Sequence, residues 1–443
     1  METSKISTVP KTTRIKVKLI KYFAVENFRS IKEENALEFD RHLPDQPNFV
    51  AHPVIGFAGA NASGKTTILQ AITFALWFMQ DSFFKIEKDA PIPIAPFCTN
   101  SDHPTKFHII FSQEMPSAGE ERRVDFEYEL SLNEHEVIYE TLHYYPLGRK
   151  RIAYIRDGRE IKIGSSLSRP ANDLRSFARD LRRNSSIISY AAQFPSQELA
   201  IACKNYQVWS NVTYSGLREL EFNPGILEDL LHDEETYSRT REFLKIADVG
   251  IEDIHYEQLH GEPLEQAIRE LKEMGEEQRR ALPPRLIENL DRVLERQELA
   301  IINLWFRHSI DSVLVDFDPD QESSGTQKFL TILHLVIQAL QEGSILILDE
   351  IELKLHQNLV AYLIGLFENA RENLKGAQLL FSFHNTSLMK LLLPEQLWFT
   401  EKNDKGQTEV FSASDFEDIK EIHEKDLEKL YRIGRFGAKP RGI

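Results

Sequence analysis

The sequence predicts an α/β fold with a parallel sheet, an antiparallel β subdomain and a helical insertion. The unbroken apolar runs at residues 54–58 and 345–348 have the character of strands buried on both faces, which is typical of parallel sheets. Residues 107–163 instead alternate apolar and polar side chains, which is the period of strands with one solvated face. Residues 167–309 carry apolar positions at helical spacing, and this pattern predicts the insertion.

Smaller patterns refine this outline. Residues 15–19 and 36–40 alternate and predict two strands ahead of the parallel sheet, and Asp157-Gly158 predicts a tight turn within the antiparallel subdomain. The apolar stripe of the insertion is expected to pack into a core rather than form a partner seam, and it is too short for a long coiled-coil arm. Its members are Leu264, Ile268, Leu271, Met274, Leu286, Leu290 and Leu294.

A glycine-rich loop follows the first apolar run. Residues 59–66 match the pattern G-x-x-x-x-G-K-[ST], between a predicted strand and a predicted helix. In such a loop the backbone N–H groups cradle phosphates, the lysine reaches the β- and γ-phosphates, and the last hydroxyl suits Mg²⁺. The sequence therefore predicts an ATP or GTP site. Its expected nucleotide contacts are Gly59, Asn61, Gly64, Lys65, Thr66 and Thr67.

The second apolar run ends in Asp349 and Glu350, which would place two carboxylates at the carboxyl edge of the sheet. We expect Asp349 to hold Mg²⁺ together with Thr66, and Glu350 to polarise the attacking water. An acidic strand end by itself is weak evidence for this chemistry. Its occurrence in the same chain as the glycine-rich loop makes the prediction specific.

Ser323, Ser324 and Gly325 precede a predicted helix at residues 328–340. Small hydroxyl residues at a helix start can form an anion site, and they can equally be an ordinary N-cap. Their position just before the acidic strand favours the anion site. His384 ends a third predicted strand, where it could donate a hydrogen bond to a γ-phosphate or serve only as a structural histidine.

The order of these motifs resembles that of the ABC-class ATPases, which include SMC and recombination-repair ATPases. Within the class the chain resembles the SMC-like AAA-type ATPases of bacterial anti-phage and toxin–antitoxin-like operons, such as PARIS-type and Septu-type ATPase subunits. The narrower resemblance rests on Glu26-Asn27-Phe28-Arg29-Ser30 and on residues 322–327, 349–352, 383–386 and 431–440.

The resemblance implies an ABC/SMC-type P-loop head that uses ATP and Mg²⁺, with Glu350 and His384 as catalytic residues. It implies an N-terminal lobe at residues 1–164, a helical lid at 165–310 and a C-terminal lobe at 311–443. It also implies a nucleotide sandwich, in which the phosphate loop of one protomer and the Ser323–Gly325 segment of another enclose one ATP. The expected assembly is a homodimer or a higher homo-oligomer.

Composition limits the partners. The net charge of −16 disfavours a surface that coats DNA, because phosphate contacts require a basic face. A local basic group is expected to be a solvated face, with nucleic-acid contact as the alternative. Its members are Arg149, Lys150, Arg151, Arg156, Arg159, Lys162, Arg175, Arg179, Arg182 and Arg183. With two distant cysteines and no long apolar run, the chain is expected to be cytoplasmic and not to associate with membranes.

Three functions fit these features. The first is an ATPase that acts as sensor and scaffold of a bacterial defence system. Because few residues follow His384, its effector, a nuclease or toxin, is expected to be a separate protein. The second is a DNA-repair ATPase of the recombination-mediator type, which the acidic balance and the short helical stripes disfavour. The third is a binding module with vestigial hydrolysis, which the presence of Asp349, Glu350 and His384 disfavours.

Overall fold

The computed structural model describes residues 18–40, 51–117, 120–164, 181–191, 208–210, 212, 234–247, 250–260, 266, 269, 300–352, 355–416 and 427–437. The chain forms two compact units. The first combines Met1–Leu220 with Gln338–Ile443, and the second is Glu221–Ile337. The lobe boundaries expected at residues 165 and 311 stay a prediction. Residues 208–210, which lie within the expected lid, pair with the main sheet of the first unit.

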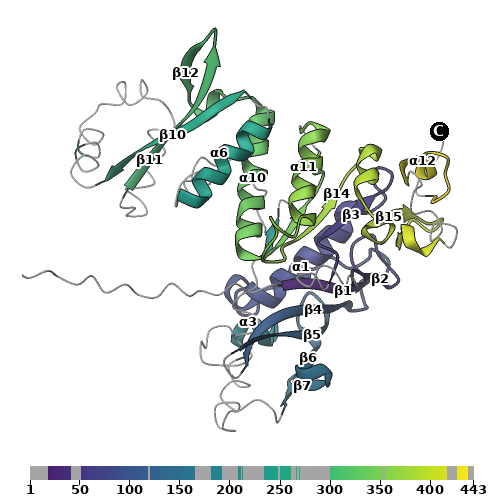
Figure 1. Cartoon of the computed structure of the whole chain (residues 1–443). Coiled ribbons are helices and arrows are strands. Elements are labelled where there is room, and N and C mark those ends of the chain that lie inside the picture. Colours follow the sequence, from purple (N-terminus) through teal and green to yellow (C-terminus); the bar gives the residue numbers. More distant parts are fainter. Residues whose placement is uncertain are drawn as a thin grey trace, which may run out of the picture. The chain divides into compact units, whose positions relative to one another are not determined.

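A six-stranded sheet organises the first unit (Figure 1). Its strands are parallel except β16, which runs antiparallel to β15. The carboxyl ends of the parallel strands therefore meet at one edge, which is where ligands bind in sheets of this kind. In spatial order the strands are β16 (Thr408–Ser412), β15 (Leu397–Lys402), β3 (Val54–Ala58), β14 (Gln378–Ser382), β13 (Ile345–Leu348) and β9 (Val208–Ser210).

An antiparallel sheet forms the second layer of this unit, as the alternating pattern predicted. Of the alternating runs expected near the start of the chain, β1 contains the described residues 18–19 and β2 contains residues 36–38. Gly158 has a φ of +55°, which suits the tight turn between β7 and β8. In spatial order the strands are β2 (Asn35–Glu38), β1 (Lys18–Glu26), β4 (Thr105–Ser117), β5 (Glu120–Leu132), β6 (Val137–Tyr144), β7 (Arg151–Asp157) and β8 (Glu160–Ile163).

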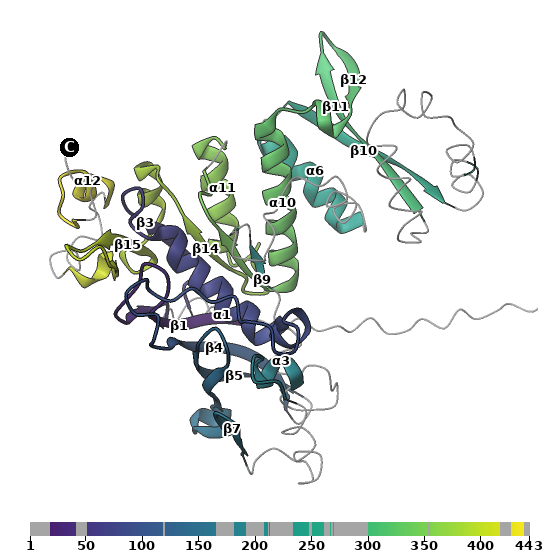
Figure 2. The same cartoon turned by 180° about the vertical axis from the view of Figure 1, so that it is seen from behind.

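The helix α1 (Lys65–Lys85) lies between the two sheets in both views (Figures 1 and 2). It is apolar on several sides, and its buried residues join one core with side chains of both sheets, including Phe57 and Phe107. On the other face of the parallel sheet, α11 (Gln357–Glu368) packs against β3 and β14. The loop that follows β3 at the carboxyl edge of the sheet therefore leads directly into a buried helix, whose first residue is Lys65.

One buried glutamine ties the two sheets together. Gln378 of β14 accepts a hydrogen bond from Ile20 N at 2.9 Å through Oε1, and its Nε2 donates to Ile20 O and His52 O at 3.0 Å each. A buried amide that meets three backbone groups is costly to replace, because each backbone group would lose its partner. The two layers are thus joined by polar as well as apolar contacts.

The end of the chain completes the first unit. The short helix α12 (Leu427–Arg432) packs on the hairpin β15–β16, where Tyr431 stacks on Phe399 with ring centroids 5.5 Å apart. Phe436 stacks on the same ring at 4.7 Å. These aromatic contacts fix the hairpin beside β3.

The second unit contains strands that the helical spacing did not predict. Its described elements are α6 (Glu234–Ala247), β10 (Ile251–His260), β11 (Ala300–Ile310), β12 (Val313–Phe317) and the first part of α10 (Ser324–Glu342). The expectation of a purely helical region between residues 167 and 309 is therefore wrong for β9, β10 and β11. The β-branched and aromatic residues of β11 favour strands, so they could have indicated this strand from the sequence. The apolar stripe at residues 264–294 lies outside the described residues.

Two of the basic residues singled out in the sequence are structural. Arg156 is 3% exposed, lies 3.7 Å from the carboxylate of Glu140, and donates to Ser185 O at 2.8 Å and Arg183 O at 3.0 Å. Burial lowers the pKa of Arg156, which the Glu140 charge opposes. Arg182 donates to two backbone carbonyls near the end of α1. Neither the solvated-face nor the nucleic-acid interpretation holds for these two; Arg175 and Arg179 lie outside the described residues.

Among the helices of the described segments, none is long and apolar enough to cross a membrane.

Candidate nucleotide-binding site

The loop between β3 and α1 requires its two glycines. Gly59 has a φ of +152°, and a Cβ there would lie 2.4 Å from Thr400 O. Gly64 has a φ of +121°, and a Cβ there would lie 2.4 Å from Thr408 Oγ1. A side chain at either position would both strain the backbone and collide with the hairpin β15–β16. The loop therefore packs closely against that hairpin.

Lys65, the first residue of α1, lies over the loop. It is 6% exposed, and its ammonium donates to Gly59 O at 2.9 Å and to Ala60 O at 3.0 Å. Burial lowers the pKa of Lys65, which the nearby carboxylates of Asp349 and Glu350 oppose. A desolvated cation at a helix start attracts an anion strongly, because little water has to be displaced.

Two oxygen ligands suited to Mg²⁺ meet beside this lysine. The Thr66 hydroxyl donates to Asp349 Oδ2 at 2.8 Å. The other carboxylate oxygen of Asp349 accepts a hydrogen bond from Ser382 Oγ, at the end of β14. A hydroxyl and a carboxylate are the hard ligands that Mg²⁺ prefers, so this pair fits the metal of a nucleotide site.

Glu350 is held in an unusual backbone conformation. Its φ is +50°, which costs a non-glycine residue on the order of 1–2 kcal/mol, and its N–H donates to Ser382 Oγ at 2.8 Å. His384 Nε2 lies 3.4 Å from Glu350 Oε1. The backbone N–H groups of His384 and Asn385 both donate to a carboxylate oxygen of Glu352. Glu350 and His384 thus face each other from neighbouring strand ends.

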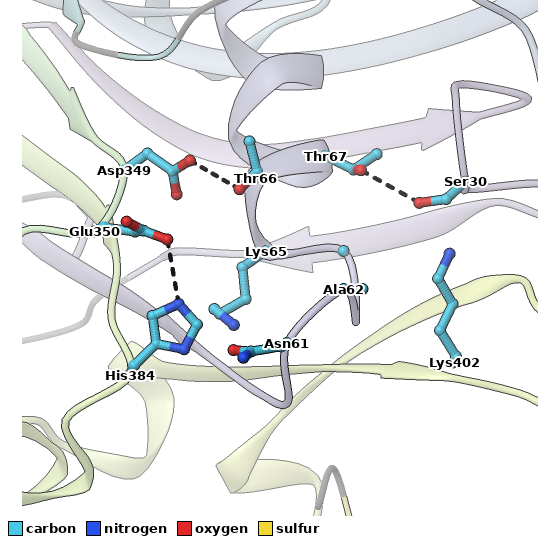
Figure 3. Close-up of a pocket in the computed structure, with 11 residues that line it drawn as sticks. Ser30, Asn61, Ala62, Lys65, Thr66, Thr67, Asp349, Glu350, His384 and Lys402 are labelled. Atoms are coloured by element: carbon cyan, nitrogen blue, oxygen red, sulfur yellow. Dashed lines mark hydrogen bonds and ion pairs between the residues drawn. The ribbon is translucent and has the colours of Figure 1, made fainter. Parts of the chain in front are cut away.

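These groups line one cavity of about 660 Å³, within the range of small-ligand sites (Figure 3). The structure brings together most of the predicted residues of the site, whereas Gly59 shapes the loop without lining the cavity. Ser30, Ala62 and Lys402 were not among the predicted site residues. The lining residues are Ser30, Asn61, Ala62, Gly64, Lys65, Thr66, Thr67, Asp349, Glu350, His384 and Lys402.

Hydroxyl groups beneath the loop were also missed. Ser30 Oγ lies 3.2 Å from Thr67 Oγ1 and 2.8 Å from Thr408 Oγ1, and the Thr408 hydroxyl donates to Ser63 O at 2.9 Å. Thr67 was a predicted contact; of the missed hydroxyls of Ser30 and Thr408, that of Ser30 belongs to the motif at residues 26–30. In that motif the buried Asn27 side chain holds the segment at residues 97–104, through hydrogen bonds that include His103 O at 2.8 Å.

Ser323, Ser324 and Gly325 belong to the second unit, whereas the residues that line this cavity belong to the first. Ser323 Oγ accepts a hydrogen bond from Thr326 N at 3.1 Å and therefore caps the start of α10. Just before it, Glu322 Oε1 lies 2.6 Å from His308 Nε2. The N-cap role is thus present, and the anion-binding role of this segment stays a prediction.

Solved structures similar to this chain include SMC heads. The SMC head domain from Thermotoga maritima has a TM-score of 0.38 and 12% identity, over 89% of this chain and 98% of that one. An SMC head bound to the C-terminal winged-helix domain of ScpA has a TM-score of 0.42 and 13% identity, over 89% and 97% of the two chains. An SMC head with an extended coiled coil, bound to the C-terminal domain of ScpA derived from Pyrococcus furiosus, has a TM-score of 0.40 and 14% identity, over 95% and 99%.

Among curated proteins none matches the sequence. The α/β fold class with an antiparallel β subdomain, expected from the sequence, is confirmed by the two sheets of the first unit, whereas the region expected as a helical insertion also contains the strands β10 and β11. Because the identities and TM-scores are low, family membership rests on a family model, which matches residues 54–390 and so spans the loop, the acidic strand and His384. By that match the chain belongs to the family described as "AAA domain, putative AbiEii toxin, Type IV TA system".

Proposed function

We propose that the protein binds ATP with Mg²⁺ and hydrolyses it in the cavity between β3, β13 and β14. The observation that carries this proposal is the convergence of the desolvated Lys65, the Thr66–Asp349 pair and the facing Glu350 and His384 on one sheet edge. Each group has a role in phosphoryl transfer. Because the groups come from separate elements of the chain, their convergence is poorly explained by chance.

The residues divide the work by position. The loop amides and Lys65 hold the β- and γ-phosphates, and Thr66 and Asp349 supply oxygen ligands to the metal. When bound, Mg²⁺ neutralises the charge of the phosphate oxygens. Glu350 accepts a proton from the attacking water, while His384, 3.4 Å from that carboxylate, is placed to donate to an oxygen of the terminal phosphate.

The assembly we propose is a homodimer, or a higher homo-oligomer, closed by the nucleotide. Ser323, Ser324 and Gly325 at the start of α10 would meet the ATP held by the phosphate loop of another copy. Association would then require ATP, and hydrolysis would release it, so that the nucleotide acts as a switch. The N-terminal end of α10 supports this role because a helix start attracts anions.

At the level of the cell, we propose a sensor and scaffold of a bacterial anti-phage system with a separate effector, a nuclease or toxin. The family description, which names a toxin of a type IV toxin–antitoxin system, supports a role in such operons. The net charge of −16, together with the structural roles of Arg156 and Arg182, disfavours the alternative of a DNA-holding repair ATPase. Such a protein would act in the cytoplasm.

Nucleotide binding is tested with Lys65→Ala, which removes the cation of the loop. We expect isothermal titration calorimetry to show ATP binding to the unmodified chain and none to the variant. An exposed lysine outside the cavity gives the matched control Lys405→Ala, which should bind ATP normally. Full ATP affinity of Lys65→Ala would contradict the assignment of the loop.

The cellular role is tested by purifying Glu350→Gln with Mg-ATP from the native host and measuring intact complexes by native mass spectrometry. A multiple of the chain mass that carries a second polypeptide would support the scaffold and identify the effector. A dimer that brings only DNA would favour the repair ATPase instead.

A further inference from the structure

The hairpin β15–β16 supplies a second lysine to the nucleotide cavity. Lys402, the last residue of β15, lines the cavity together with Ser30 and Thr67. In Figure 3 its side chain extends along the side of the cavity opposite Glu350 and His384. Lys402 lies outside residues 54–390, the part of the chain that the family model matches. The sequence pattern gave it no role.

The position of Lys402 is fixed by the backbone and by the loop. It pairs in register with Thr408, the first residue of β16. Thr408 is 1% exposed, donates its backbone N–H to Ser30 O at 2.7 Å, and donates its hydroxyl to Ser63 O at 2.9 Å. The strand end that bears Lys402 is therefore bound to the phosphate loop itself, so the lysine is held at a set place relative to any phosphate in that loop.

The surroundings of Lys402 suit an anion. The side chain is partly buried, and burial lowers the pKa of Lys402. Ser30 and Thr67, which line the same cavity, carry hydroxyls that can also donate to a bound anion. A partly desolvated ammonium gains more from a phosphate oxygen than an exposed lysine does.

The direction of the nucleotide follows from the opposite side of the cavity. Glu350 and His384 mark the end where the terminal phosphate reacts, and Lys65 with Thr66 lies in the middle. If the γ-phosphate lies beside Glu350 and His384, the triphosphate crosses the start of α1. The α-phosphate, which is nearest the nucleoside, then lies beside Thr67 and Lys402. The geometry points to Lys402 as a residue that binds the α-phosphate of the nucleotide, an inference that rests on the proposed ATP site.

This role has a distinct thermodynamic signature. ATP, ADP and AMP share the α-phosphate, and AMP has no other phosphate, so loss of the Lys402 charge should weaken all three by the same factor, about tenfold for one charge-assisted hydrogen bond. A contact to the β-phosphate would weaken ATP and ADP but not AMP. A contact to the γ-phosphate would weaken ATP alone. A contact to the nucleoside would weaken adenosine as well.

The experiment is calorimetric titration of the full chain with AMP, ADP and a non-hydrolysable ATP analogue, for the unmodified protein, Lys402→Met and Lys405→Met. Lys405 is exposed on the turn of the same hairpin and does not line the cavity, so it controls for the loss of a charge there. We expect Lys402→Met to bind all three nucleotides about tenfold more weakly and Lys405→Met to bind as the unmodified chain does. A loss that spares AMP would place Lys402 at the β-phosphate and overturn the inference. Lys402→Arg, which keeps the charge, should retain most of the affinity. If Lys402→Met does not fold, Lys402→Gln provides a second neutral replacement.

Several results would overturn the inference. Unchanged affinity of both neutral variants, or a loss confined to the triphosphate analogue, would remove Lys402 from the α-phosphate. An equal loss of adenosine binding would do the same. If the unmodified chain binds none of the three nucleotides, the proposed function fails, and this inference fails with it; the two failures are thus distinguishable.

Discussion

Replacing Ser382 by alanine removes one hydroxyl that serves both carboxylate residues of the cavity. Ser382 is fully buried at the end of β14, where its Oγ donates to the carboxylate of Asp349 and accepts the N–H of Glu350 at 2.8 Å. The second bond holds Glu350 at a φ of +50°. The variant should therefore free Asp349, the carboxylate proposed to bind the metal, and relax the backbone of Glu350, the proposed catalytic residue.

The magnitude follows from these two bonds. A hydrogen bond to a charged group contributes about 1.5–3 kcal/mol, and a buried N–H left without a partner costs about 1–3 kcal/mol. Because water in the cavity can reach the partly exposed Asp349, we expect Ser382→Ala to lower the free energy of unfolding by about 2 kcal/mol. If about 1.4 kcal/mol of transition-state positioning is lost as well, kcat should fall about tenfold.

The assay compares steady-state ATP hydrolysis, ATP affinity and thermal unfolding for Ser382→Ala and a matched control. Ser344→Ala makes the same change at the amino end of the neighbouring strand β13, where the hydroxyl contacts Glu342 Oε2 at 3.2 Å, away from the cavity lining. We expect the kcat of the control to stay within about twofold of the unmodified chain. A kcat of Ser382→Ala equal to that of the control would refute the positioning role.

Two further predictions concern assembly and pH. Ser323→Arg should leave ATP binding intact but block ATP-dependent association, measured by analytical ultracentrifugation. The exposed control Glu395→Arg should associate normally. Unchanged association of Ser323→Arg would argue against the nucleotide sandwich. The hydrogen bond from Lys390 lowers the pKa of Glu428, so the unfolded chain binds more protons than the folded one and the stabilisation is lost as the pH falls through that lowered pKa. Glu428→Gln should consequently melt below the unmodified chain at neutral pH, and the gap should close as the pH falls below the ordinary pKa of a glutamate and through the lowered pKa of Glu428. A gap that stays constant across this range would count against the coupling.

The parts of the fold that could be predicted depend on local sequence. The strands β3 and β13 are short apolar runs, and the loop at residues 59–66 is a contiguous motif, so both could be read without knowledge of distant contacts. The alternation of the antiparallel sheet is equally local. The acids and His384 converge because parallel strands end at one edge, which the order of the motifs implied; their chemical roles stay predictions.

The parts that could not be predicted depend on contacts between distant segments. Ser382 is an ordinary serine until β14 pairs beside β13, and Lys402 enters the cavity only because β15 pairs with β3. Thr408 meets the loop from 345 positions away in the chain. The strands β10 and β11 were missed for another reason, since their separation of some forty residues hides an antiparallel pair from any short window.

Single-turnover hydrolysis by Glu350→Gln tests the central claim most directly. The variant keeps the size and hydrogen-bonding capacity of the side chain but removes the base, so Mg-ATP should bind with normal affinity while phosphate release slows about a hundredfold or more. The unmodified chain should convert the bound ATP fully in the same experiment. Equal rates for the two proteins would show that Glu350 is not the catalytic base of this site.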